Sequence, residues 1–280
     1  MKRAHLLEVA LLLVPGAAMA QLVDEFNAPP SNCCLAMTAK TLADQLQDWN
    51  QLGRYYAANQ ELKKQPGDPG RVVFMGDSIT DGWRLEEYFP GRPYVNRGIS
   101  GQVTAQMLVR MYPDVIDLKP AAMVVLAGTN DIARNNGPAT PEMIEENITA
   151  MTELAQRHGI KVLLCSILPV SDYPYLAQQS ARAAAPSAAA PGGGRAGRGP
   201  MVRQRMTVGR PPADILGLNA WMKNYAAQAG ATYVDYFSAL VDEKGWLKDG
   251  IANDGLHPNP EGYRIMVPIV SAAIDQALRP

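Results

Sequence analysis

The sequence predicts an α/β fold in which a parallel sheet carries helices on both faces. Short apolar runs, too brief for helices, recur along the chain and are typical of buried strands; they lie at 72–75, 121–127 and 161–168. Longer stretches with apolar residues at helical spacing lie at 140–158, 213–229 and 261–278. Strands that alternate with amphipathic helices form βαβ units, and such units build a parallel sheet that is covered on both sides.

Local signals place the remaining elements of the sheet. Thr140 followed by Pro141 is typical of a helix start. Gly230 is placed to end the preceding helix, because glycine readily adopts the left-handed conformation of a helix end. Shorter elements are predicted as strands at 93–96 and 232–236 and as a helix at 102–112.

Residues 21–70 are predicted to form an extended lead-in followed by a helix that covers the sheet. From Thr38 to Lys64 apolar and aromatic residues recur at roughly helical spacing, and such a stripe is expected to pack into the core. The Pro- and Gly-rich run at 65–70 ends this helix.

Residues 175–212 interrupt the pattern of strands and helices. They are rich in Ala, Gly and Pro, and the stretch contains no acidic residue. Its arginines are Arg182, Arg195, Arg198, Arg203, Arg205 and Arg210. Such a composition cannot bury enough apolar surface to offset the entropy lost on ordering. It predicts a disordered insertion at the carboxyl edge of the sheet with solvated arginines. The alternative is that the arginines face substrate or bind a polyanion.

The composition limits the classes of partner. The chain has 280 residues, 47% of them hydrophobic, and a formal net charge of −1, which suits one large globular domain and predicts no nucleic-acid partner. No apolar run reaches membrane-spanning length. With three histidines and no Cys/His cluster, no metal site is expected. Cys165 is expected to be buried, whereas the state of Cys33 and Cys34 is left open.

Residues 1–20 have the pattern of a bacterial secretory signal peptide. Two basic residues open the chain, an apolar stretch at 6–14 follows, and a small-residue cleavage site lies at 18–20. We expect cleavage after Ala20 and a periplasmic or secreted protein. Glu8 interrupts the apolar stretch, so a cytoplasmic protein is the alternative.

Ser78 is the candidate nucleophile. It follows the strand at 72–75 directly, and Ile79 can begin a helix. Its hydroxyl therefore lies at the carboxyl end of a strand, where open α/β sheets bind ligands, and beside backbone N–H groups that stabilise a developing anion. The alternative is that Asp77 and Ser78 only cap that helix.

A serine hydroxyl needs a general base, and His257 is the histidine that remains for this role. His158 ends a predicted helix, and His5 belongs to the leader. Asp254, three residues before His257, can fold back to accept the imidazole N–H and stabilise the imidazolium. The alternative roles are an Asp-Gly turn for Asp254 and a structural loop histidine for His257.

The tetrahedral intermediate of acyl transfer needs preorganised donors for its oxyanion. Three candidates follow three predicted strands: the backbone N–H of Ser78, the backbone N–H of Gly98 and the side-chain amide of Asn130. Glycine at position 98 lets a substrate oxygen approach the main chain closely. Asn130 has an alternative role as a turn or cap residue.

These blocks resemble the SGNH/GDSL hydrolase family. Gly76-Asp77-Ser78-Ile79 is similar to the GDSL motif, and Ser78, Gly98, Asn130 and His257 occur in the family's order, with Asp254 three residues before the histidine. The resemblance covers roughly 70–278 and is strongest, over 96–131, to the lysophospholipase-like and platelet-activating-factor-acetylhydrolase-like branch. It implies a three-layer α/β/α flavodoxin-like fold with about five parallel strands, a hydrolase domain at 71–280 and no cofactor.

The resemblance implies a serine esterase that works through an acyl-enzyme. Sites in this family are usually open grooves, and the chain has no long apolar lid segment, so short acyl chains from acetyl to butyryl are expected. The expected partner is a small ester or an acetylated carbohydrate. The alternatives are a carbohydrate O-acetylesterase, a thioesterase or lysophospholipase, and a non-catalytic carbohydrate-binding protein. The oligomeric state is left open.

Overall fold

Five parallel strands form the centre of the structure, a computed structural model that describes residues 43, 46–184 and 205–279. Their spatial order is β2-β1-β3-β4-β5, and the strands are β1 (Val72–Gly76), β2 (Tyr94–Gly98), β3 (Ala122–Leu126), β4 (Lys161–Cys165) and β5 (Thr232–Val234). Every neighbouring pair is parallel. This is the flavodoxin-like order, so the predicted α/β fold with about five parallel strands is confirmed.

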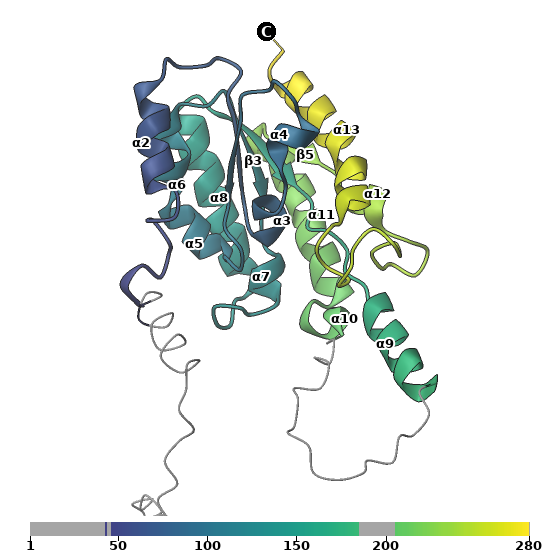
Figure 1. The fold of residues 1–280 in the computed structure, drawn as a ribbon. Coiled ribbons are helices and arrows are strands. Elements are labelled where there is room, and N and C mark those ends of the chain that lie inside the picture. Colours follow the sequence, from purple (N-terminus) through teal and green to yellow (C-terminus); the bar gives the residue numbers. More distant parts are fainter. Residues whose placement is uncertain (1–42, 44–45, 185–204, 280) are drawn as a thin grey trace, which may run out of the picture. The chain divides into compact units, whose positions relative to one another are not determined.

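Alternate residues of the strands face two separate apolar cores, because successive side chains of a strand point to opposite faces. Val73 and Met75 of β1 contribute to one core with α5 (Thr104–Val109), α6 (Met111–Asp114), α8 (Pro141–Arg157) and α11 (Pro212–Ala229). Val72 and Phe74 contribute to the other with α4 (Leu85–Tyr88), α12 (Phe237–Leu240) and α13 (Pro260–Ala277). Figure 1 shows α5 and α8 on one side of the sheet and α4 and α13 on the other. The three-layer prediction is confirmed.

The long helices begin and end where local signals predict. Thr140 accepts a hydrogen bond from the N–H of Met143 at 3.3 Å, and Pro141 takes the first helical position of α8. Gly230 ends α11 with a left-handed φ of 66°. Cys165 is a buried free thiol, as expected.

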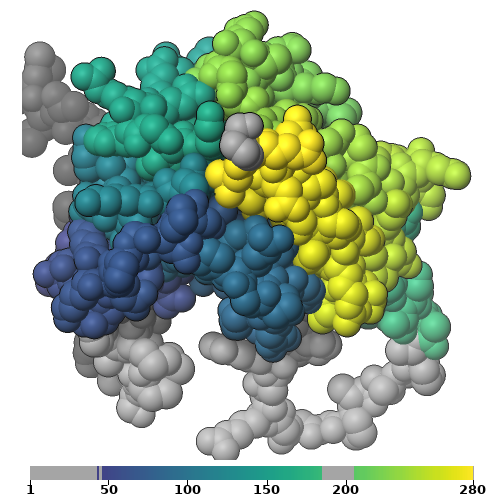
Figure 2. All heavy atoms as spheres, turned by 90° about the horizontal axis from the view of Figure 1, so that it is seen from above, coloured from purple at the N-terminus to yellow at the C-terminus, as the bar shows by residue number. Residues whose placement is uncertain are grey.

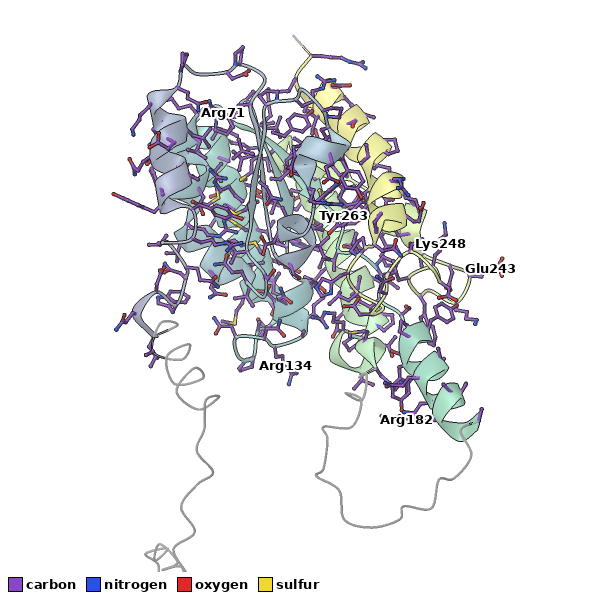
Figure 3. All side chains as sticks on the ribbon, in the orientation of Figure 1. Arg71, Arg134, Arg182, Glu243, Lys248 and Tyr263 are labelled. Atoms are coloured by element: carbon purple, nitrogen blue, oxygen red, sulfur yellow. The ribbon has the colours of Figure 1, made fainter. Side chains whose placement is uncertain are left out.

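Helix α13 begins three residues after His257 and contacts the segment that follows Ser78. Viewed from above (Figure 2), it lies in yellow against the blue segment that contains α4 and β2, where Arg92 and Asp275 form an ion pair at 3.8 Å. Tyr263, labelled in Figure 3, reaches inward from α13 and donates a hydrogen bond to the carbonyl of Ile79 at 2.8 Å. Its ring stacks on Trp83 with centroids 5.2 Å apart. The C-terminal helix thus holds α3 (Ser78–Asp81) in place.

The predicted helix at 38–64 is interrupted in the structure, and residues 38–42 and 44–45 of it lie outside the described range. Helix α2 spans Tyr56–Lys64, and turns occupy 52–55. The Asp48 carboxylate accepts the N–H groups of Leu52 and Gly53, and this local bonding competes with a continuous helix. Trp49, Leu52 and Tyr56 are 50%, 39% and 65% exposed, so their prediction as core residues is wrong.

The signal-peptide pattern at 1–20 and Cys33 and Cys34 lie outside the described residues. Among the residues that are described, no helix combines the length and the apolarity of a membrane span.

Both ends of the predicted disordered insertion are ordered. Helix α9 spans Tyr173–Ala184 and α10 spans Met206–Gly209, so the prediction is wrong there; its middle, 185–204, lies outside the described residues. The buried carboxylate of Asp172 accepts Nε of Arg205 at 2.8 Å and the N–H and hydroxyl of Thr207 at 3.1 and 2.7 Å. We call these contacts the Asp172 clasp. The composition of 175–212 did not reveal this contact, because Asp172 lies just before that stretch.

Candidate active site

Ser78, His257 and Asp254 form a continuous hydrogen-bonded row. The Oγ of Ser78 lies 2.8 Å from Nε2 of His257, and Nδ1 of His257 lies 2.6 Å from Oδ2 of Asp254. An ionised carboxylate only accepts hydrogen bonds, so the proton sits on Nδ1 and Nε2 is left to accept from the serine hydroxyl. The structure therefore brings together three side chains that the sequence analysis singled out far apart in the chain.

The turn between β1 and α3 presents Ser78 at the end of the sheet. Asp77 caps α3, because its Oδ1 accepts the N–H of Ile79 at 2.9 Å. Gly76 makes the tight turn possible: a Cβ there would lie 2.1 Å from Oγ1 of Thr80. Ser78 opens α3, and its backbone N–H makes no hydrogen bond within the described residues.

The loop that carries Asp254 and His257 is fixed from two sides. Oδ1 of Asp254 accepts the N–H groups of Leu256 and His257 at 3.0 and 2.8 Å. Ser171, on the segment after β4, donates its N–H to the carbonyl of Gly255 at 2.8 Å. Burial alone would raise the pKa of Asp254, but the hydrogen bonds from His257 and Leu256 outweigh it and lower that pKa. Asp254 is therefore ionised.

The side-chain amide of Asn130 is oriented by three groups. Its Nδ2 donates to the carbonyl of Gln102 at 3.0 Å, and its Oδ1 accepts from Asn135 at 2.8 Å and from Arg210 at 3.4 Å. A carbonyl cannot donate and a guanidinium cannot accept, so the amide has one allowed orientation. Asn130 is buried on α7 (Thr129–Ile132), directly after β3, and one of its two amide protons remains unused.

Gly98 does not offer a free donor, and its prediction as an oxyanion residue is corrected. Its N–H already donates to Oδ1 of Asn96 at 2.8 Å, and its carbonyl accepts from the hydroxyl of Tyr55. Glycine is needed here for packing, because a Cβ would lie 2.1 Å from the backbone N of Asp81. Position 98 is thus explained by the close approach of β2 to α3.

Gly101 is a residue that sequence reasoning missed. Its φ is 83°, and a Cβ there would meet no atom within 4 Å. The hydroxyl of Ser100 donates to Asp81 of α3 at 2.6 Å, while Gln102 accepts from Asn130, so Gly101 lies between the two. Its N–H makes no hydrogen bond to any described residue. Gly98 ends β2 and Gly101 follows it closely, and no pattern in the sequence distinguishes their roles.

Arg210 was also missed, and its prediction as a solvated arginine is wrong. Only 9% of the residue is exposed, and its Nε donates to Oγ1 of Thr129 at 3.0 Å. Asp77 is a second buried titratable group beside the row, and its Oδ2 has no hydrogen-bond partner in the part of the chain that the structure describes. Burial raises the pKa of Asp77 to about 6, and the Ile79 N–H and the charges of His257 and Arg210 limit the rise.

The raised pKa of Asp77 predicts a pH-dependent stability difference. Between about pH 4 and pH 6 the folded protein keeps a proton that the unfolded chain releases, so this group lowers the free energy of unfolding as pH rises. Asp77→Asn should therefore gain stability relative to wild type over that range, by up to about 3 kcal/mol at pH 7. Urea unfolding of both proteins at several pH values measures this. A difference that stays flat would contradict it.

No group of three or more His, Cys, Asp or Glu in the described ranges is arranged to hold a metal ion.

Residues 74–265 match the model of the GDSL-like lipase/acylhydrolase family. The chain belongs to this family. Ser78, Asn130, Asp254 and His257 all lie inside the matched range of the GDSL model.

Individual relatives agree with the GDSL assignment. A candidate acylhydrolase from Bacteroides fragilis is 36% identical in a solved structure, with a TM-score of 0.68, and the match covers 83% of this chain and 99% of that one. The esterase TesA of Pseudomonas aeruginosa is 34% identical over 110 residues, which is 34% of this chain and 53% of the relative. An uncharacterized lipoprotein of Bacillus subtilis is 30% identical over 118 residues, 35% of this chain and 49% of the relative. The chain thus spans about half the length of the curated relatives it matches.

Proposed function

We propose that this protein is a serine esterase that cleaves carboxylic esters through an acyl-enzyme. The observation that carries the proposal is the row of Ser78, His257 and Asp254, with distances of 2.8 and 2.6 Å. His257 takes the proton of Ser78 as Oγ attacks the acyl carbon, then gives it to the leaving alcohol. Water, deprotonated by His257, attacks the acyl-enzyme and releases the acid. Asp254 orients the imidazole and stabilises its protonated form.

The proposed oxyanion donors are the N–H groups of Ser78 and Gly101 and the free amide proton of Asn130. Support comes from hydrogen bonding: within the described ranges, the N–H groups of Ser78 and Gly101 and one amide proton of Asn130 have no acceptor, and the amide has a fixed orientation. Donors held in place before reaction stabilise developing charge without further reorganisation.

Short acyl chains, from acetyl to butyryl, are the proposed substrates. The groups around the serine hydroxyl are polar, and the side chains of His257 and Asp254 are 43% and 42% exposed. A long acyl chain needs an extended apolar surface in place of these groups.

A series of p-nitrophenyl esters from acetate to palmitate tests this preference. We expect kcat/KM to reach its highest value between acetate and butyrate and to rise no further with longer chains, because methylenes that stay in water gain none of the about 0.8 kcal/mol that burying each one would give. Equal or better turnover of the palmitate ester would contradict the short-chain proposal while leaving the esterase proposal intact.

A carbohydrate O-acetylesterase is the second candidate, and a groove beside the catalytic loop favours it. The groove, about 630 Å³ in volume, is lined by Tyr173 and Leu176 of α9 and by Asp249 and Asn253, next to Asp254. An aromatic ring with polar neighbours suits a sugar as the alcohol part of the ester. Acetate release from acetylated xylan or pectin would favour this candidate, whereas turnover of lysophospholipid or acyl-CoA would favour a lysophospholipase or a thioesterase.

We further propose that the hydrolase domain extends over 71–280 and that the protein is exported to the periplasm or secreted. Support comes from the leader pattern at 1–20 and from the relative named a lipoprotein. Sequencing the N-terminus of the mature protein tests cleavage after Ala20.

A further inference from the structure

Arg210 is a buried cation where the predicted insertion meets the candidate active site. The arginines of the insertion were expected to be solvated, yet Arg210 contacts the two residues that open α7. Its Nε donates to Thr129 at 3.0 Å and its Nη2 to Oδ1 of Asn130 at 3.4 Å. We propose that Arg210 is a positioning residue of the oxyanion site and acts through the amide of Asn130. This inference rests on the proposed esterase function.

The contacts define what Arg210 can do for Asn130. Oδ1 of Asn130 accepts hydrogen bonds from Asn135 and from the guanidinium of Arg210. These two bonds keep Oδ1 from rotating toward a substrate. A cation at Oδ1 also withdraws electron density from the amide and makes the remaining Nδ2 proton a stronger donor. That proton matters most when the substrate oxygen becomes negative. Arg210 should therefore stabilise the transition state more than the bound ester.

Arg210 also stands among acidic groups that keep it charged. Burial lowers the pKa of its guanidinium, and the negative charges of Asp77 and Asp254 oppose that effect. Arginine stays protonated under such conditions. The candidate active site therefore contains a permanent positive charge that the protein itself supplies.

The Asp172 clasp holds Arg210 in position. Asp172 binds Arg205 and Thr207, which flank Met206, the first residue of α10. The N–H of Arg210 then bonds the carbonyl of Met206 at 2.9 Å. The end of the insertion is therefore a built part of the site.

A double-mutant cycle tests the inference on p-nitrophenyl acetate. Arg210→Met should lower kcat about 10- to 100-fold, with KM within about twofold, because one charge-assisted contact is lost. Asn130→Ala should lower kcat about 100- to 1000-fold. The double variant should be no slower than Asn130→Ala alone, since Arg210 acts through that amide. Losses that multiply would overturn the inference.

Two further variants guard against trivial explanations. Arg210→Lys keeps the buried charge and should fold as wild type while recovering only part of kcat, because an ammonium lacks the planar donor pair. Arg264→Met removes an exposed arginine on α13, paired with Glu261, and should leave kcat unchanged. Full recovery by lysine would show that charge alone suffices and would overturn the role of the contact with Asn130.

A readout without turnover separates this inference from the proposed function. The side-chain NH₂ resonances of Asn130, identified by their loss in Asn130→Ala, should move in the Arg210→Met spectrum. If wild type hydrolyses no ester but these resonances move, the proposed function fails and the contact stands. If wild type hydrolyses esters and the resonances stay in place, the inference fails and the esterase stands.

Discussion

Replacing Ser78 by alanine should lower kcat for ester hydrolysis by about 10⁴-fold or more, the scale of loss when the nucleophile of a serine hydrolase is removed. The row of hydrogen bonds then lacks its reacting atom, while His257 and Asp254 keep their mutual contact at 2.6 Å. Stability should change little, because Ser78 Oγ makes its contact at a partly exposed site. Hydrolysis of p-nitrophenyl acetate, with thermal unfolding as the check on folding, measures both.

Ser238→Ala is the matched control for this loss. Ser238 is exposed, and its hydroxyl bonds Asp235 on its own turn and no other described residue, so removing that hydroxyl should leave kcat unchanged. If Ser78→Ala retained activity within about tenfold of wild type, another group would be the nucleophile and the esterase mechanism proposed above would be wrong. If neither protein hydrolysed any ester while both were folded, the non-catalytic binding protein would become the better hypothesis.

Gly255→Ala should destabilise the protein by more than about 4 kcal/mol, a range reached only when packed backbone is forced apart. The residue has a φ of 84°, and a Cβ there would lie 2.1 Å from the carbonyl oxygen of Ser171. The chain must shift to accept it, and His257 lies two residues away. Since a displacement of about 1 Å can cost about 100-fold in rate, kcat should fall as well. Thermal unfolding should show a fall in Tm of about 10 °C or more.

Gly250→Ala separates the backbone conformation from the clash. Its φ of 80° is nearly the same, but a Cβ there meets nothing within 4 Å. The left-handed conformation alone costs about 1–2 kcal/mol, so the control should lose that much stability and keep its activity. Equal losses in the two variants would mean that the contact with Ser171 does not fix the catalytic loop.

The sequence predicted the sheet and the row of three side chains because both rest on local patterns. Buried strands such as β1 and β3 show as apolar runs, and the cap of α8 shows as Thr140-Pro141. Ser78 and His257 stood out because a strand end and a lone unassigned histidine are both visible in one chain. Their catalytic role stays a prediction until the kinetics above are measured.

The misses share a physical cause: each depended on contacts between distant segments. The sequence does not distinguish Gly98 from Gly101. The structure does, because the N–H of Gly98 bonds Asn96 and its Cα packs against the backbone of Asp81. Trp49 lies in a helical pattern that the Asp48 turn breaks. Arg210 belongs to a stretch whose average composition predicts disorder, whereas its own burial is set by Thr129 and Asn130, about 80 positions earlier.

The Asp172 clasp has a consequence for how this protein could diversify. Because the clasp joins Asp172 directly to Arg205, it holds α10 and Arg210 through a contact that does not depend on how many residues separate the two partners. The entropy of closing such a segment rises slowly, by about 0.6 kcal/mol for each doubling of its length. Length changes between the two partners that spare α9 should therefore cost little free energy of folding. Related chains could alter what approaches the ester while keeping the same chemistry beneath it.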